Sequence, residues 1–142
     1  MAHDRVDTVR SVYDHWREGD FRTTFELFDR NVVFVMPPEL PDSGTYLGTD
    51  AVADYTRQFL EPWTHLTIDA EDLVGEGDTV LASVVQRGAG DASGAATEIR
   101  YFQLWSFRGD RVIRLENVRD RGDALEGRGS RLMRPGRSQE RR

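Results

Sequence analysis

The sequence has no cysteine among its 142 residues. This absence excludes disulfides, zinc–thiolate sites, iron–sulfur clusters and cysteine nucleophiles. Its three histidines, His3, His15 and His65, include no i,i+4 pair, so we expect no metal site. Uncharged stretches such as residues 31–38 are far shorter than the roughly 20 apolar residues of a membrane span, and the start does not resemble a signal peptide. We therefore expect a cytoplasmic protein that does not enter a membrane.

Lysine is absent as well, and all 19 basic residues are arginine. Residues 128–142 hold six arginines and one acid, a net charge of +5, whereas the other 127 residues hold 13 arginines and 24 acids, a net charge of −11. An acidic body repels phosphate backbones, so the charge argues against nucleic-acid binding by the body. We expect residues 127–142 to form a disordered tail; the alternative is an arm that binds nucleic acid or an acidic partner.

Apolar residues recur at helical spacing in two long segments. The first predicts an amphipathic helix over residues 5–18, ended by Gly19 in a left-handed conformation. Asp20 follows at the position of a cap for a short helix. The second segment predicts a helix from Thr49 or Asp50, either of which could cap it, to about residue 61.

The remaining apolar residues alternate with a period of two, which predicts strands. One strand, residues 31–36, lies between the helices, and four more follow the second long helix, at residues 64–74, 79–88, 96–108 and 111–119. Glycine- and aspartate-rich turns connect these four. Helices first and a meander last predict one α+β domain over residues 1–126, with a curved antiparallel sheet packed on the helices.

Three segments in this order resemble a known family. They are REGDFRTTFELFDRNVVF (17–34), GTYLGTDAVADY (44–55) and GDRVIRLENVRD (109–120). Together they are similar to the SnoaL-like group of the nuclear transport factor 2-like superfamily, which includes isomerases, epoxide hydrolases, polyketide cyclases, dehydratases and non-catalytic binding proteins. The resemblance implies a cone in which the sheet curls around the helices and leaves an apolar pocket open at one end.

The resemblance also implies candidate catalytic residues. Asp120 matches the acid–base aspartate of cyclases and limonene-1,2-epoxide hydrolase, and Gln103 matches the oxyanion-hole aspartate of ketosteroid isomerase. Asn117 could polarise an epoxide or carbonyl oxygen, and Arg87 matches the arginine of the epoxide hydrolase. The alternatives are structural: Asp120 could cap a turn, Gln103 could satisfy backbone groups, and Asn117 could be a solvated strand residue.

Other catalytic positions of these enzymes are altered. Met36 stands where ketosteroid isomerase has its general base, and Val12 lies near the position of its tyrosine. Ala89 replaces an aspartate of the epoxide hydrolase. Steroid isomerisation is therefore not expected, and hydrolysis through a carboxylate pair lacks one partner.

Aromatic residues concentrate on the inward positions of the predicted elements. We expect a flat hydrophobic ligand to contact some of them, together with the methionine that ends the first strand: Tyr13, Trp16, Met36, Tyr55, Trp63, Tyr101 and Trp105. The opposite face of strand 96–108 carries Phe102 and Leu104. An apolar outer face of this kind predicts a homodimer formed sheet to sheet.

Two functions fit these observations. One is a cofactor-free enzyme acting by general acid–base catalysis on an apolar ketone, enol or epoxide. The other is a binding or accessory domain with the same pocket and no chemistry. In both, the partner is a small hydrophobic molecule.

Overall fold

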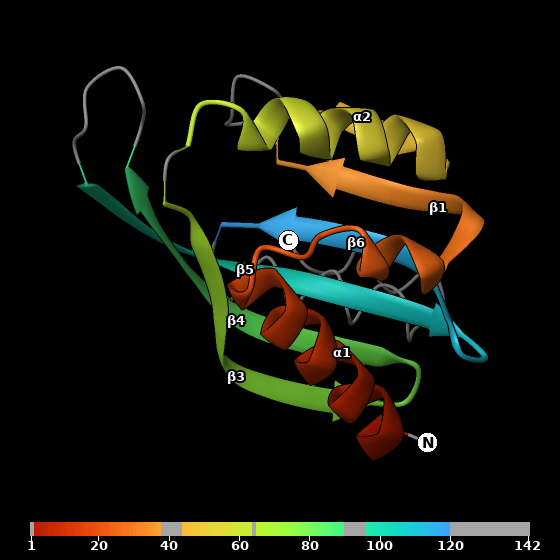
Figure 1. Cartoon of the computed structure of the whole chain (residues 1–142). Helices are drawn as coiled ribbons and strands as arrows, with labels where there is room; N and C mark the ends of the chain where they lie inside the picture. Colours follow the sequence, from red (N-terminus) through yellow and green to blue (C-terminus); the bar gives the residue numbers. More distant parts are fainter. Residues whose placement is uncertain (1, 38–43, 64, 90–95, 120–142) are drawn as a thin grey trace, which may run out of the picture.

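A computed structural model describes residues 2–37, 44–63, 65–89 and 96–119 of the chain. These residues form two α-helices, one 3₁₀ turn and six strands (Figure 1). In chain order, the elements are α1 (Ala2–Arg17), η1 (Thr23–Glu26), β1 (Phe28–Met36), β2 (Gly44–Leu47), α2 (Thr49–Leu60), β3 (Thr67–Glu76), β4 (Thr79–Ala89), β5 (Ala96–Arg108) and β6 (Arg111–Val118). The expected tail lies outside the described residues.

Helix α1 buries the face that its apolar spacing predicted. Val9, Val12 and Tyr13 are almost completely buried. The helix ends as expected, because Gly19 has a φ of 85° and its N–H donates a hydrogen bond of 2.9 Å to the carbonyl of Trp16. Glycine adopts this left-handed conformation without the steric cost that a side chain would add.

The segment after α1 forms a single 3₁₀ turn, so the prediction of a short α-helix was wrong in type. The Asp20 carboxylate accepts hydrogen bonds from the backbone N–H groups of Arg22 and Thr23 and from the Thr23 hydroxyl. These bonds hold the pKa of the Asp20 carboxyl group below its usual value, and the bond from the Thr23 hydroxyl contributes most to the shift. The turn leaves no room for a longer helix, because β1 begins at Phe28, three residues earlier than predicted.

The strands form one sheet in the order β2-β1-β6-β5-β4-β3. Neighbouring strands of the predicted meander, β3 to β6, are antiparallel. Strand β1 lies beside β6 in a parallel pair, with Phe34 opposite Leu115. The α+β prediction is confirmed, with this one pair as the departure from a purely antiparallel sheet.

Strand β2 and the start of α2 differ from the expectations. The four residues of β2 pair antiparallel with β1 at the sheet edge, whereas the sequence prediction placed a loop, and no second strand, between residue 36 and the second long helix. The cap position of α2 is Gly48, with a φ of 89° and no side-chain hydrogen bond, so neither Thr49 nor Asp50 caps it.

Both helices lie on one face of the curved sheet (Figure 1). Helix α1 packs on β3 and β4, and α2 packs on β1 and β2. The core between helices and sheet includes Trp105, Phe107 and Leu115. Of the described helices, neither is long and apolar enough to cross a membrane.

The outer sheet face holds a second, small hydrophobic cluster. Leu81 and Leu104 are buried in it, and Phe102 and Val118 pack against them. Leu104 is only 1% exposed within the single chain, so it does not offer the open surface on which the dimer prediction rested. The homodimer stays a prediction, which sedimentation equilibrium of the full chain would decide.

Candidate functional site

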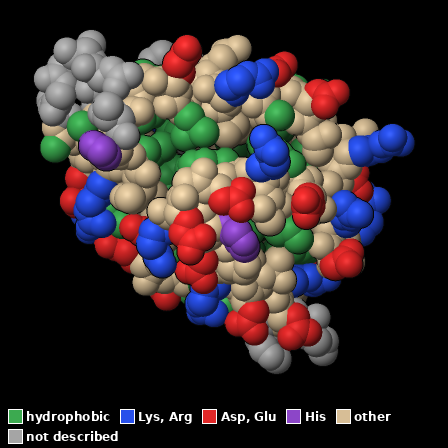
Figure 2. All heavy atoms as spheres, viewed as in Figure 1, with side chains coloured by type: hydrophobic (Ala, Val, Ile, Leu, Met, Phe, Trp, Pro, Cys, Tyr) green, Lys and Arg blue, Asp and Glu red, His purple; other side chains and the backbone are tan. Residues whose placement is uncertain are grey.

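A cavity of about 490 Å³ opens between the helices and the inner face of the sheet. Figure 2 shows hydrophobic side chains gathered in the space between α1 and α2, with charged side chains around it. The described lining residues are predominantly apolar: Trp16, Phe21, Thr24, Phe25, Phe28, Phe34, Met36, Pro37, Val52, Tyr55, Thr56, Phe59, Trp63, Ile68, Gln86, Ile99, Arg100, Tyr101, Gln103, Leu115, Asn117, Val118 and Arg119. A cavity of this size and composition is typical of small-molecule sites.

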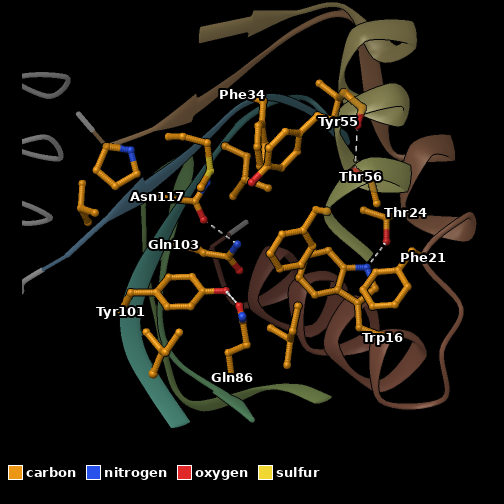
Figure 3. Close-up of a pocket in the computed structure, with 18 of the residues that line it drawn as sticks. Trp16, Phe21, Thr24, Phe34, Tyr55, Thr56, Gln86, Tyr101, Gln103 and Asn117 are labelled. Atoms are coloured by element: carbon orange, nitrogen blue, oxygen red, sulfur yellow. Dashed lines mark hydrogen bonds between the residues drawn. The ribbon is translucent and has the colours of Figure 1, made fainter. Parts of the chain in front are cut away.

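Aromatic rings from the helical side form one wall. The Trp16 and Phe21 rings stack with centroids 5.6 Å apart, and the Trp16 indole N–H donates a 2.7 Å hydrogen bond to the Thr24 hydroxyl (Figure 3). The rings of Tyr55 and Phe59 stack at 6.0 Å. Because the Trp16 N–H has its partner within the protein, the wall presents flat hydrocarbon surface to a ligand.

Trp63 extends this wall because a glycine on β4 leaves room for it. A Cβ atom on Gly88 would lie 2.6 Å from Cε3 of the Trp63 ring, far inside van der Waals contact. Glycine at this strand position therefore lets the ring lie directly on the backbone.

The sheet side carries a chain of buried neutral polar groups. The Trp105 indole N–H donates to the Tyr13 hydroxyl at 3.0 Å, and that hydroxyl donates to Oε1 of Gln103 at 2.5 Å. Nε2 of Gln103 donates to Oδ1 of Asn117 at 2.9 Å (Figure 3), and Nδ2 of Asn117 donates to the backbone carbonyl of Val35 at 3.0 Å. The chain therefore joins α1 to three strands of the sheet.

A second polar pair lies beside this chain. The Tyr101 hydroxyl donates to Oε1 of Gln86 at 2.9 Å (Figure 3). Burial raises the pKa of Tyr101, and burial raises that of Tyr13 well above the usual phenol value, so both hydroxyls are neutral at physiological pH.

The described part of the lining contains no carboxylate and no histidine. Its charged members are Arg100 and Arg119. Arg100 forms ion pairs with Glu71 and Glu98, whereas no ion pair of Arg119 with another described residue is found. Nor do the described residues include three metal-ligating side chains close enough to hold an ion. The polar part of the described site can therefore donate and accept hydrogen bonds but offers no carboxylate or imidazole for proton transfer.

The structure brings together most of the residues that the sequence pointed to. The cavity lining includes the expected ligand contacts Trp16, Met36, Tyr55, Trp63 and Tyr101 and the candidate catalytic amides Gln103 and Asn117.

Three other expected residues lie elsewhere, and a fourth is not among the described residues. Tyr13 and Trp105 are buried behind Gln103 rather than in the described lining. Arg87 is exposed and pairs with Glu98 at 3.0 Å, outside the cavity. Asp120 lies outside the described residues.

Gln86 and Phe21 were missed as cavity residues. Gln86 follows Val80, Ala82 and Val84 at every second position of β4, and all four are buried. A polar residue on the buried face of a strand is the signal that would have identified it.

This fold, a curved sheet over two helices, is shared with solved nuclear transport factor 2-like structures. One such protein from Burkholderia pseudomallei is 17% identical, with a TM-score of 0.72 over 84% of this chain and 92% of its own. The protein TerC, co-crystallised with polyporic acid, is 16% identical, with a TM-score of 0.70 over 85% and 95%. A protein with a ketosteroid isomerase-like fold from Catenulispora acidiphila is 12% identical, with a TM-score of 0.62 over 76% and 78%.

The sequence gives the narrower assignment. Residues 9–115 match the model of the SnoaL-like domain family. The chain belongs to this family. No curated protein matches it in sequence.

Proposed function

We propose that the protein binds a flat, apolar small molecule in the cavity between α1, α2 and the sheet. The observation that carries this proposal is the cavity itself, about 490 Å³ with an aromatic wall facing buried neutral amides. Apolar surface supplies the affinity in such sites, and a few fixed polar groups orient the ligand. TerC, which shares the fold, was crystallised with a small molecule, polyporic acid.

Titration with the bicyclic hydrocarbon tetralin tests this proposal. Binding should quench tryptophan fluorescence, because Trp16 and Trp63 line the cavity. Thr56→Phe places a ring in the cavity and should weaken binding at least about tenfold, the effect of losing roughly 1.4 kcal/mol of contact. Thr97→Phe, on an exposed part of β5, is the matched control and should bind as the wild type does. Failure of the wild type to bind tetralin would contradict the proposal.

A second candidate function is catalysis in the same cavity on an apolar ketone, enol or epoxide. The favouring observation is that Arg119 lines the cavity and Asp120 follows it directly in the chain. Asp120 would act as general acid and base, with Gln103 or Asn117 donating a hydrogen bond to the developing oxyanion. No cofactor is needed for this chemistry.

Deuterium exchange of 1-tetralone tests the catalytic candidate. A carboxylate base would remove a proton from C2 to give the enolate, and a deuteron would return to C2 in D₂O. We expect the protein to accelerate this exchange and Asp120→Asn to lose about 100-fold or more of it. Asp110→Asn removes a carboxylate from the exposed turn between β5 and β6 and should leave the rate unchanged. Binding without exchange would identify a non-catalytic binding protein.

A further inference from the structure

The outer face of the sheet carries buried side chains, although no described element packs on it. On β5, Leu104 and Ser106 alternate with Trp105, whose ring belongs to the core under the helices. Leu81 lies opposite Leu104 on β4. These three residues, the outer patch, are at most 3% exposed within the single chain. Both helices lie on the inner face (Figure 1), and a sheet face without a cover is solvated. Some other part of the chain therefore covers the outer patch.

The hydroxyl of Ser106 leads to the same conclusion. Its Oγ atom is buried and has no hydrogen-bond partner among the described residues. On an open sheet face water would solvate this hydroxyl, and burying it without a partner is unfavourable. A segment that lies over the sheet excludes this water and brings backbone groups of its own to the hydroxyl.

The short segments outside the described residues are badly placed to cover the patch. Residues 90–95 join β5 at Ala96, which lies about 26 Å along the strand from Leu104 at roughly 3.3 Å per residue. Six residues anchored at both ends extend at most about 12 Å from their anchors. Residues 38–43 follow Pro37 and residue 64 follows Trp63, and both neighbours line the cavity on the inner face. Residue 1 precedes α1, which also lies on the inner face.

Residues 120–142 begin beside the outer patch. Strand β6 ends at Val118, which packs against the leucines of the patch together with its strand neighbour Phe102. The segment contains Leu125, Leu132 and Met133, whose apolar side chains gain from burial. Residues 128–142 have a net charge of +5 and the other 127 residues one of −11, so electrostatic attraction also favours contact with the body.

We infer that residues 120–142 dock on the outer face of the sheet and cover the outer patch. The arginine-rich end of the chain is then part of the packed domain instead of the disordered tail that its composition suggested. It occupies the face on which the homodimer was expected, so a second copy of the chain is the competing occupant. The cover lies on the opposite face of the sheet from the cavity, and its presence is independent of the proposed function.

Alkylation of single cysteines tests this cover, because the chain has no cysteine of its own. Ser106→Cys places a thiol of similar size in the outer patch and breaks no hydrogen bond to a described residue. Thr97→Cys, on an exposed part of β5, is the reactive reference, and Val84→Cys, in the inner core, is the protected one. In the full chain we expect iodoacetamide to modify Ser106→Cys at least about 100-fold more slowly than Thr97→Cys. Equal rates would overturn the inference.

Removal of residues 120–142 identifies the cover. In a chain that ends at Arg119, we expect Ser106→Cys to react at least about tenfold faster than in the full chain, while Val84→Cys stays protected. An unchanged slow rate would show that another part of the chain covers the patch and would overturn the inference. Protection that falls when the full chain is diluted would assign the cover to a second copy and would overturn it as well.

A full-length variant decides the matter if the shortened chain does not fold, which a reactive inner reference would reveal. Leu132→Ser with Met133→Ser removes apolar side chains from the segment and keeps its length and charge. We expect Ser106→Cys to react at least about fivefold faster in this background. The matched control, Glu140→Ser with Arg141→Ser, also keeps the net charge and should leave the rate unchanged. Equal rates in the two backgrounds would overturn the inference.

Discussion

The two faces of strands β4 and β5 differ in the kind of polar side chain that they carry. On the inner face, Gln86, Tyr101 and Gln103 are neutral and hydrogen-bonded to one another or to neighbouring side chains. On the outer face, Arg87 pairs with Glu98 in an exposed ion pair. Buried groups must be uncharged and matched atom by atom, because water cannot replace a lost partner. Exposed ion pairs lose little when they are broken, because water solvates both charges.

The sharpest way to break this contrast is to place a charge on the inner face. Gln103→Glu replaces the N–H donor facing Asn117 by a carboxylate oxygen in a site only 4% exposed. We expect a loss of about 3 kcal/mol or more in the free energy of unfolding at pH 7, measured by urea denaturation. The loss should shrink near pH 5, because burial favours the protonated carboxyl.

The matched control for that variant is Glu98→Gln on the outer face. It removes the charge of an exposed carboxyl group, whose pKa is lowered by the hydrogen bonds from Arg87 and Arg100. Its free energy of unfolding should stay close to that of the wild type. Equal losses in the two variants would contradict the distinction between the faces.

Raising the pH tests the buried phenols without a mutation. Tyr13 and Tyr101 have pKa values raised by burial, so the folded chain keeps protons that the unfolded chain releases near pH 10. Their contribution to stability is complete below about pH 10 and declines as the pH rises toward the folded-state pKa, by about 1.4 kcal/mol per unit for each phenol. The chain has no lysine and no cysteine, so tyrosine is the residue type whose ordinary pKa lies between pH 9 and 11.

Unfolding measured at intervals from pH 8 to 11 checks this prediction. Tyr101→Phe removes one of the two buried phenols and should reduce the slope above pH 10 by about half. A stability that is flat to pH 11 would mean that neither phenol is protected from ionisation by the fold.

Strand β5 shows what could and could not be predicted from the alternation of residues in the sequence. This alternation placed Tyr101, Gln103 and Trp105 on one face correctly, because a strand has only two faces. The alternation could not predict how far each inward residue lies from the cavity. Tyr13 and Trp105 point inward as expected, yet Gln103 lies between them and the cavity. Which inward residue touches a ligand depends on packing between elements about 90 residues apart.

The sequence also could not predict which strands far apart in the chain pair with each other. The parallel neighbours β1 and β6 lie near opposite ends of the domain, and no local pattern links Phe34 to Leu115. Strand β2 is four residues long, too short to show a period. The resemblance pointed to Gln103 and Asn117, which the structure places together, and to Arg87, which it places outside the cavity.

Arg87→Ala provides the smallest expected effect and completes the comparison. The Arg87 side chain is 49% exposed, and its ion pair with Glu98 lies on the outer face. We expect Tm to shift by less than about 2 °C and to shift less still in 0.5 M salt, because exposed ion pairs are weak and screened. Tetralin binding should match the wild type, since the guanidinium does not reach the described cavity lining. Loss of tetralin binding or of 1-tetralone exchange in this variant would contradict this expectation. Arg87 would then have the catalytic position that the resemblance to the epoxide hydrolase suggested, and the outer face would no longer be separate from the site.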